Sequence, residues 1–265
     1  MIARALAGRG LAGLVLAALV AVVARRARSL TASGAIAATV IGALAVAADW
    51  TWGALLIVYF AVSTALSRFG KTSKERRIGS IVAKSGPRDA NQVLANGAMF
   101  AAAALAFVVR PDIRWITLGA GSLAASAADT WATEIGTLYG TKARSILTWR
   151  VVPVGTSGGI SAIGTLAAIA GAGFIAFVTS LLGWTPIVAR NVMVGGVGGA
   201  LLDSLLGATI QSRRWCDTCE RETERTLHDC GNQTRRLRGV SWLDNDMVNV
   251  LSNIAGAFIA VLLPR

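Results

Sequence analysis

Residues 187–210 read IVARNVMVGGVGGALLDSLLGATI, an apolar run long enough to cross a bilayer as one helix. The run contains one cation and one acid, Arg190 and Asp203, and four glycines within 195–199. This length and composition are typical of a transmembrane helix. The glycines would let a second helix backbone approach closely beside the carboxylate. We therefore start from a membrane-spanning helix that carries an acid.

Seven further apolar runs of similar length are each bounded by charge, Pro or polar clusters. They lie at about residues 11–24, 30–49, 52–67, 93–109, 115–138, 158–180 and 246–263. With 54% hydrophobic and 15% charged residues in 265, this pattern predicts an all-α, polytopic membrane helix bundle of about eight transmembrane helices. The spans use most of the chain, so we expect residues 1–265 to form a single integral membrane domain.

The first run, residues 11–24, is short enough to be a signal peptide. Arg25, Arg26 and Arg28 follow it directly, which is typical of a stop-transfer segment rather than of a cleavage site. We interpret the run as a retained helix, with the signal peptide as the alternative.

The basic residues are distributed asymmetrically, and the formal net charge is +12. Twenty of the 26 Lys and Arg fall in four alternate loops, at 25–28, 68–92, 139–157 and 211–245. Because cytoplasmic loops retain such charge, we expect these loops in the cytoplasm, both termini outside, and a multi-pass protein of the cell membrane. The charge would meet anionic lipid or phosphate. Nucleic acid is disfavoured, since no recognition motif accompanies it.

Four acids lie at positions that the bilayer disfavours. Asp129, Glu134 and Asp203 fall inside predicted helices, and Asp246 opens the last one. An uncompensated charge costs about 2.5–3.5 kcal/mol at the centre of a membrane helix, so each acid is a candidate functional residue. The alternative is a protonated or hydrogen-bonded acid that only packs the bundle.

Two of these acids belong to polar stripes on otherwise apolar helices. The stripes, at helical spacing, are Ser122, Ser126, Asp129 and Thr133, and Asp246, Asn249, Asn253 and Gly256. Helix capping by Asp244 or Asn245 explains one residue of the second stripe but not the rest. Oxygen atoms aimed inward from three helices predict a Mg²⁺ site, with Asp129, Asp203 and Asp246 as the catalytic acids. The predicted Mg²⁺ ligands are Asp129, Glu134, Asp203, Asp244 and Asp246.

A cation pathway would use the same oxygen atoms, so a transporter is the alternative to an enzyme.

Two of the basic loops have the composition of a phosphate site. Lys84 and Arg88 share their stretch with Gly, Pro, Asn91, Gln and Asn96, which suits an ordered turn that aims donors at a ligand. The cations at 71–77 are interpreted as a topology signal only.

The second loop ends in Gly155, Thr156, Ser157, Gly158 and Gly159, just before a helix. Free N–H groups and the positive end of the helix dipole would favour an anion there. The loop is not a P-loop, because the Gly-Lys-Ser/Thr ending is missing, and glycine-rich helix ends are also ordinary in membrane bundles. Ser204 and Asn249, beside the predicted acids, complete the predicted phosphate-binding set.

The three cysteines and the single histidine of the chain lie within one short segment. They are Cys216, Cys219, His228 and Cys230, inside the 211–245 loop. Four such ligands make a closed structural Zn²⁺ knuckle, which would fold an otherwise marginal loop. Redox-active or unliganded thiols are the alternative. A disulfide is disfavoured in the cytoplasm, and catalytic zinc is disfavoured because a closed set leaves no position for water.

Together these motifs resemble those of the transmembrane protein 19 family, also known as the phytyl-phosphate kinase family and long catalogued as a domain of unknown function. The resemblance covers about residues 30–260 in the same motif order. The motifs are residues 91–97, 129–136, 153–159 and 203–208, the Cys/His cluster, and residues 243–249.

The resemblance implies a membrane enzyme that phosphorylates an isoprenoid monophosphate to the diphosphate. It also implies a nucleoside triphosphate donor, most simply CTP, and Mg²⁺, since the family is distantly similar to polyprenol kinases and CDP-diacylglycerol synthases. A flippase or transporter of a phosphorylated lipid or cation is the alternative from another class. A cytidylyltransferase that makes a CDP-linked lipid is the alternative within the same class.

Overall fold

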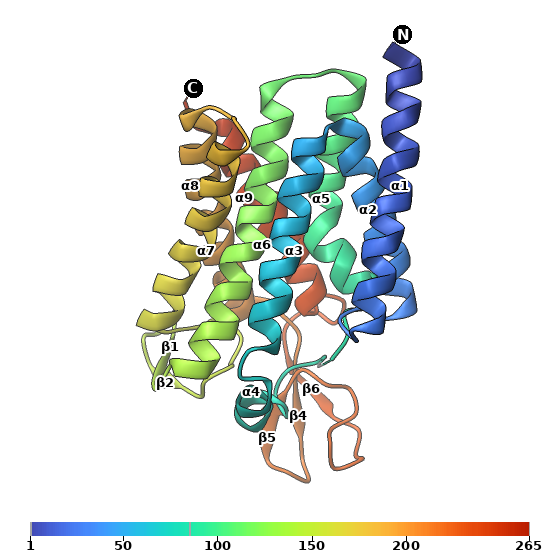
Figure 1. Cartoon of the computed structure of the whole chain (residues 1–265). Helices are drawn as coiled ribbons and strands as arrows, with labels where there is room; N and C mark the ends of the chain where they lie inside the picture. Colours follow the sequence, from blue (N-terminus) through green and yellow to red (C-terminus); the bar gives the residue numbers. More distant parts are fainter. Residues whose placement is uncertain (1, 85, 265) are drawn as a thin grey trace.

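The computed structural model describes residues 2–84 and 86–264, with the backbone alone for residues 2–7. Over these residues the chain forms eight long helices and one short one, with two small sheets at one end (Figure 1). The helices are α1 (Ile2–Arg26), α2 (Ala32–Ala48), α3 (Trp50–Arg68), α4 (Lys71–Ile78), α5 (Ala90–Val109), α6 (Ile113–Tyr139), α7 (Ala162–Leu181), α8 (Pro186–Thr209) and α9 (Asn245–Leu262).

The two sheets belong to the loops that follow α6 and α8. The first has the order β2-β1-β3, and the second has the order β5-β4-β6; all neighbouring strands are antiparallel. Their strands are β1 (Ala143–Ser145), β2 (Val151–Val152), β3 (Gly159–Ile160), β4 (Arg213–Cys216), β5 (Arg221–Thr223) and β6 (Arg235–Arg238).

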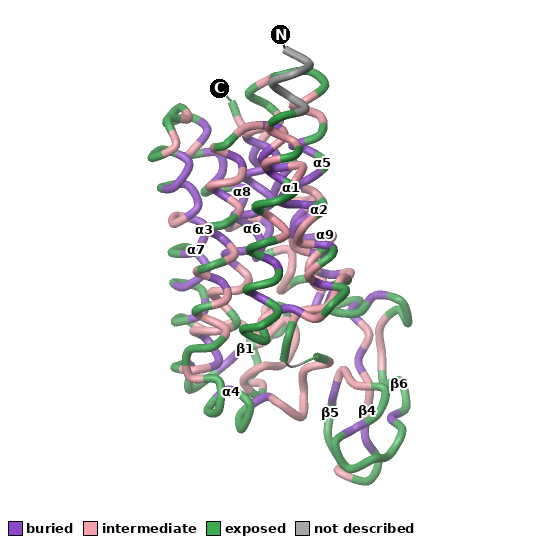
Figure 2. Tube along the Cα trace, turned by 45° about the vertical axis from the view of Figure 1, so that its right-hand side comes forward, coloured by how far each residue is buried: buried purple, intermediate pink, exposed green. Residues whose placement is uncertain are grey.

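The predicted polytopic helix bundle is confirmed. Each apolar run corresponds to one long helix, and six helices of the described chain are long and apolar enough to cross a membrane: α1, α3, α5, α7, α8 and α9. The apolar helix α2 has only 17 residues. Helix α6 is enclosed by its neighbours over residues 117–128, which are all buried, so Ser122 and Ser126 of its polar stripe face protein. Figure 2 shows buried positions inside the bundle and exposed ones on its outer faces and around the strands.

The chain connects consecutive long helices alternately at the two ends of the bundle. Both termini lie at one end, and α4 and the strands lie at the other (Figure 1). The connections at the terminal end are short, because side-chain caps such as Asp49, Asp112 and Thr185 start the next helix at once. The four basic loops therefore share the other end, which we call the loop end.

Glycines allow α6, α8 and α9 to pack with their backbones in contact. A Cβ atom added to Gly199 would lie 2.5 Å from the Ala125 Cβ and 2.8 Å from the Ser252 carbonyl oxygen. One added to Gly195 would lie 2.4 Å from the carbonyl oxygen of Gly256. Neither neighbour is a flexible side-chain end, so larger residues would force the helices apart.

We expect Gly199→Ala to lower the free energy of unfolding by about 1–3 kcal/mol, because the new methyl group meets backbone in a packed interface. The matched control is Gly173→Ala on α7, where the added Cβ has only Met193 Cε at 4.0 Å. The control should be neutral or slightly stabilising, since alanine favours helix. Thermal unfolding in detergent measures both, and equal stability of the two variants would contradict the close contact.

Candidate functional site

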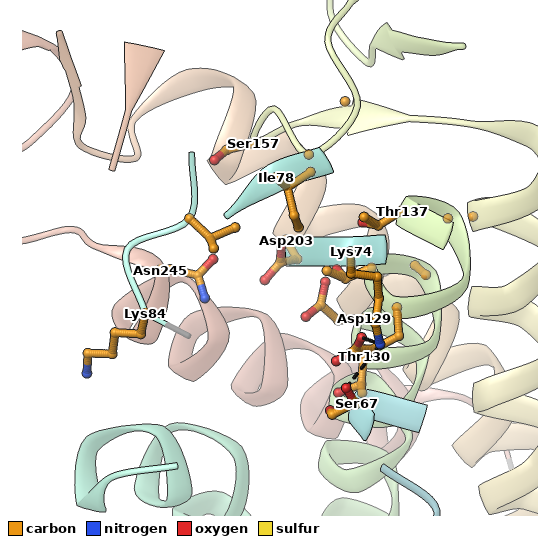
Figure 3. Close-up of a pocket in the computed structure, with 18 of the residues that line it drawn as sticks. Ser67, Lys74, Ile78, Lys84, Asp129, Thr130, Thr137, Ser157, Asp203 and Asn245 are labelled. Atoms are coloured by element: carbon orange, nitrogen blue, oxygen red, sulfur yellow. Dashed lines mark hydrogen bonds and ion pairs between the residues drawn. The ribbon is translucent and has the colours of Figure 1, made fainter. Parts of the chain in front are cut away.

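A cavity of about 730 Å³ lies at the loop end of the bundle. Its walls come from α3, α4, α6, α7 and α8, from the start of α9, and from loop residues within 79–84, 86–88 and 154–161 (Figure 3). The wall carries acids, cations, hydroxyl groups and glycines on the side of the loops. Deeper between α7 and α8 it carries apolar side chains. The cavity thus combines a polar part with an apolar part.

Two acids from different helices meet in this cavity. Asp129 of α6 and Asp203 of α8 both line it (Figure 3), and the two carboxyl groups influence each other electrostatically. The Asp203 carboxylate accepts a hydrogen bond from Ser252 Oγ at 3.2 Å. Within the described residues, no cation or hydrogen-bond donor contacts the carboxylate of Asp129. The pair therefore places two carboxyl groups together without a protein cation against them.

The other membrane acid of α6 is neutralised. Glu134 forms an ion pair with Lys74 Nζ, which also donates to the carbonyl oxygens of Leu66 at 2.8 Å and Ser67 at 3.1 Å. The Lys74 side chain is only 8% exposed. The interpretation of residues 71–77 as a topology signal missed this lysine. Its spacing from Ile78, the other buried residue of α4, is the signal that could have found it.

The acid at the start of α9 also has a cation. Lys84 Nζ lies 2.6 Å from the Asp246 carboxylate and 2.9 Å from that of Asp89. Burial alone would lower the pKa of Lys84, but these two acids outweigh it and raise the pKa above its ordinary value. Arg88, also at the cavity, donates to Ser67 Oγ at 3.2 Å. Both cations predicted to bind phosphate therefore line the cavity.

Most of the predicted site residues share this one cavity. Those that line it are Lys84, Arg88, Asp129, Glu134, Gly155, Thr156, Ser157, Gly158, Gly159, Asp203, Ser204, Asp244 and Asp246. Asp244 also caps α9, where it accepts from the N–H of Met247 at 3.0 Å. Asp244 therefore has the capping role that the sequence offered as an explanation, and it also lines the cavity.

Three predicted phosphate-binding residues are not among the residues that line the cavity: Asn91, Asn96 and Asn249. Asn96 is used inside the bundle, since its side chain accepts from Ser126 Oγ at 2.6 Å and donates to the Gln92 carbonyl oxygen at 2.9 Å. The sequence pattern placed Asn96 on a polar helix face, but that face packs against α6.

One acid at the cavity escaped the sequence analysis. Glu224 follows β5, and its carboxylate accepts from the N–H of Ala83, from Ser157 Oγ and from Gln211 Nε2. Burial raises the pKa of Glu224, and the hydrogen bond from Ser157 is the strongest effect that opposes this. It lies in a loop rich in Arg and Glu, where nothing in the sequence separates it from its neighbours.

The predicted zinc ligands come together in the loop between α8 and α9. One ligand atom from each of Cys216, Cys219, His228 and Cys230 lies within 4.8 Å of the others. All three thiols are free. The Nε2 atom of His228 is buried and has no hydrogen-bond partner in the described chain. The other ring nitrogen, Nδ1, lies 3.4 Å from Cys230 Sγ. A ring nitrogen beside three free thiols has the chemistry of a metal ligand set.

Comparison with known proteins gives one family and several relatives. The family model described as "Integral membrane protein DUF92" matches residues 15–257. Protein PGR of Arabidopsis thaliana is 29% identical over 273 residues, which cover 92% of each chain. The chloroplastic protein VTE6 of the same plant is 29% identical over 243 residues, or 89% of this chain and 66% of VTE6. An uncharacterized membrane protein of Methanocaldococcus jannaschii is 28% identical, over 92% of this chain and 89% of its own. No solved structure matches the chain.

We expect Lys74→Ala to lower the free energy of unfolding by about 3 kcal/mol, because it leaves Glu134 as an unpaired acid in a mostly buried position. Lys71→Ala is the control from the same helix. Its ion pair with Glu75 spans 3.7 Å between side chains that are half exposed, so its loss should cost less than about 1 kcal/mol. Chemical denaturation of the two variants measures the difference, and a similar small loss for both would show that the Lys74 pair stabilises nothing.

Proposed function

Because the chain belongs to the DUF92 family of integral membrane proteins, we propose that it is a membrane kinase for an isoprenoid monophosphate. It would transfer a phosphoryl group from a nucleoside triphosphate and yield the prenyl diphosphate. The motif resemblance to the phytyl-phosphate kinase family and the match to VTE6 support the reaction class. The observation that carries the proposal is the pair of uncompensated acids, Asp129 and Asp203, in a cavity bordered by basic and glycine-rich loops.

The donor set of the two acids fits Mg²⁺. Carboxylate oxygens are the ligands that this ion prefers, and two close carboxylates without a protein cation leave a charge that a divalent ion would balance. Asp129 and Asp203 would hold the ion, with Asp244, Asp246 and Glu134 near them in the cavity wall. When bound, the ion would offset the negative charge of the phosphates.

Lys84, Arg88 and the loop from Gly155 to Gly159 would hold the phosphates. Two anionic substrates must meet, so the site needs positive charge beyond one metal ion. Lys84 is kept at the cavity by Asp89 and Asp246, while Arg88 is oriented by Ser67. A monophosphate acceptor is already an anionic nucleophile near neutral pH, so positioning replaces a general base.

The deeper part of the cavity suits a lipid tail. Ile169 on α7 and Val197, Ala200 and Leu201 on α8 line it with apolar side chains. Ile169 and Leu201 are also exposed, and both helices are candidate membrane spans. An isoprenoid chain would lie along these residues with its phosphate toward the acids. CTP as the donor and the cytoplasmic face of the cell membrane as the location are part of the same proposal.

The experiment that tests the proposal is a direct assay. Purified protein is incubated with Mg²⁺, each of four nucleoside triphosphates and a panel of prenyl monophosphates, and the products are identified by mass. A prenyl diphosphate together with the nucleoside diphosphate supports the kinase. Pyrophosphate and a nucleotide-linked lipid would instead indicate a cytidylyltransferase. If no pair reacts, the kinase proposal is overturned and transport becomes the hypothesis.

We expect Asp129→Asn and Asp203→Asn each to lower turnover at least about 100-fold, because each removes one of the two carboxylates that would hold the metal ion at the phosphates. Neither should lower the melting temperature, since loss of one of two like charges reduces their repulsion. Asp217→Asn, at a side chain that is 67% exposed, is the control. Near-normal turnover in either cavity variant would show that the acid only packs the bundle.

We also propose that Cys216, Cys219, His228 and Cys230 bind one structural Zn²⁺. Elemental analysis of protein purified without chelator should find about one zinc per chain, as expected for a closed four-ligand set. Cys216→Ser should lose the zinc and lower the melting temperature, because metal binding contributes to the folding of such loops. Glu220→Gln, in an exposed position of the same loop, should retain the zinc and the melting temperature of the unmodified protein. Absence of metal from the unmodified protein would eliminate this site.

A further inference from the structure

Glu224 joins three segments that are distant in sequence. Its Oε2 accepts from the N–H of Ala83 at 3.2 Å, and its Oε1 accepts from Ser157 Oγ and from Gln211 Nε2 at 2.9 Å. Ala83 precedes Lys84 in one cavity loop, and Ser157 belongs to the glycine-rich loop. One carboxylate therefore contacts both loops that we assign to phosphate binding.

The residues beside Glu224 fix the first of these loops. The N–H of Glu224 donates to the Ile81 carbonyl oxygen at 2.8 Å, and Thr223 Oγ1 donates to that of Ser80 at 2.9 Å. Arg225 donates to the carbonyl oxygens of Val82 at 2.9 Å and of Gly79 at 2.7 Å. Three consecutive residues thus hold every carbonyl group from Gly79 to Val82.

The glycine-rich loop is fixed from the same side. Arg213 of β4, which pairs with β5, donates to the Ser157 carbonyl oxygen and to that of Gly207 at 3.4 Å. A Cβ atom added to Gly158, whose φ is +76°, would lie 2.5 Å from the backbone of Ala208. Helix α8 blocks movement of the glycine-rich loop on one side. The hydrogen bonds from Arg213 and to Glu224 restrain the loop on the other side.

We propose that Glu224 is the positioning residue of the phosphate site, and that through it the Cys/His segment, residues 211–238, sets the spacing between the two phosphate-facing loops. The identity of the ligand rests on the proposed function, whereas the contacts that Glu224 makes with the two loops do not. Three donors from three segments converge on the half-buried carboxylate of Glu224, and hydrogen bonds to charged groups are stronger than those between neutral groups. Glu224 itself would not touch the reacting atoms.

Glu224→Gln tests this assignment in the full chain, because glutamine keeps the shape but removes the charge and replaces one acceptor oxygen with a donor. Hydrogen–deuterium exchange should become at least about tenfold faster in residues 79–84 and 153–159, and unchanged in the helices. Glu220→Gln removes an exposed charge from the same segment and should leave exchange unchanged. Glu224→Asp, which keeps the charge, should restore part of the protection.

Kinetics then separate positioning from general stability. For Glu224→Gln we expect KM for the nucleotide and the prenyl phosphate to rise about tenfold, with a smaller change in kcat and an unchanged zinc content. If the unmodified protein transfers no phosphoryl group, the proposed function fails, while loop exchange still decides the positioning role. Should Glu224→Gln not fold, Gln211→Ala removes a single donor and should accelerate exchange in residues 153–159. Exchange at the unmodified rate in both loops would overturn the proposal.

Discussion

The backbone contact between α6 and α8 is the constraint on which the site depends. Glycine at 199 lets α8 lie against Ala125 of α6, and Gly256 brings α9 against the same alanine. Asp129 and Asp203 lie one turn or so beyond these contacts, so the packing that excludes larger side chains also fixes the distance between the acids. Two like charges would otherwise separate, and the bundle prevents it because its core cannot expand at low cost.

Charge balance divides the acids of the cavity into two kinds. Glu134 has a lysine from α4 and Asp246 has one from the loop before α5, and these ion pairs connect α4 and residue 84 to the helix bundle. Asp129 and Asp203 have no such cation among the described residues, although loop cations line the same cavity. The paired acids attach the loops to the bundle, whereas the unpaired ones keep their capacity for an external cation. The shared position at the cavity does not by itself distinguish these four acids; their ion pairs do.

The sequence predicts the bundle well because the features that mark a buried membrane helix lie within that helix's own sequence. An apolar run, a capping residue and a glycine pattern lie within one helix, and Asp129, Asp203 and the Cys/His cluster could be found in the same way. The spacing of Lys74 from Ile78 could have shown that Lys74 is buried, but not that its partner is Glu134, 60 residues away. Glu224 could not be found in this way, because its partners Ala83 and Ser157 are 141 and 67 residues away along the chain. Asn96 shows the opposite error, since a polar stripe indicates a face but not which neighbour covers that face.

The distance of the acids from the loop end bears on where a lipid substrate would lie in the proposed reaction. At about 1.5 Å per residue, Asp203 lies about 9 Å from the loop end of α8 and Val197 about 18 Å from it. A phosphate that reached Asp203 from the loops would leave water for a region of low dielectric, where its charge must be balanced. In the proposed function, the loop cations and a metal ion would supply that balance on one side, while the apolar wall beyond Asp203 would accept a chain that already prefers lipid. A water-soluble phosphate would gain nothing from that wall. For the kinase that we propose, the arrangement therefore favours an acceptor whose tail stays in the bilayer while only its phosphate enters the polar part of the cavity.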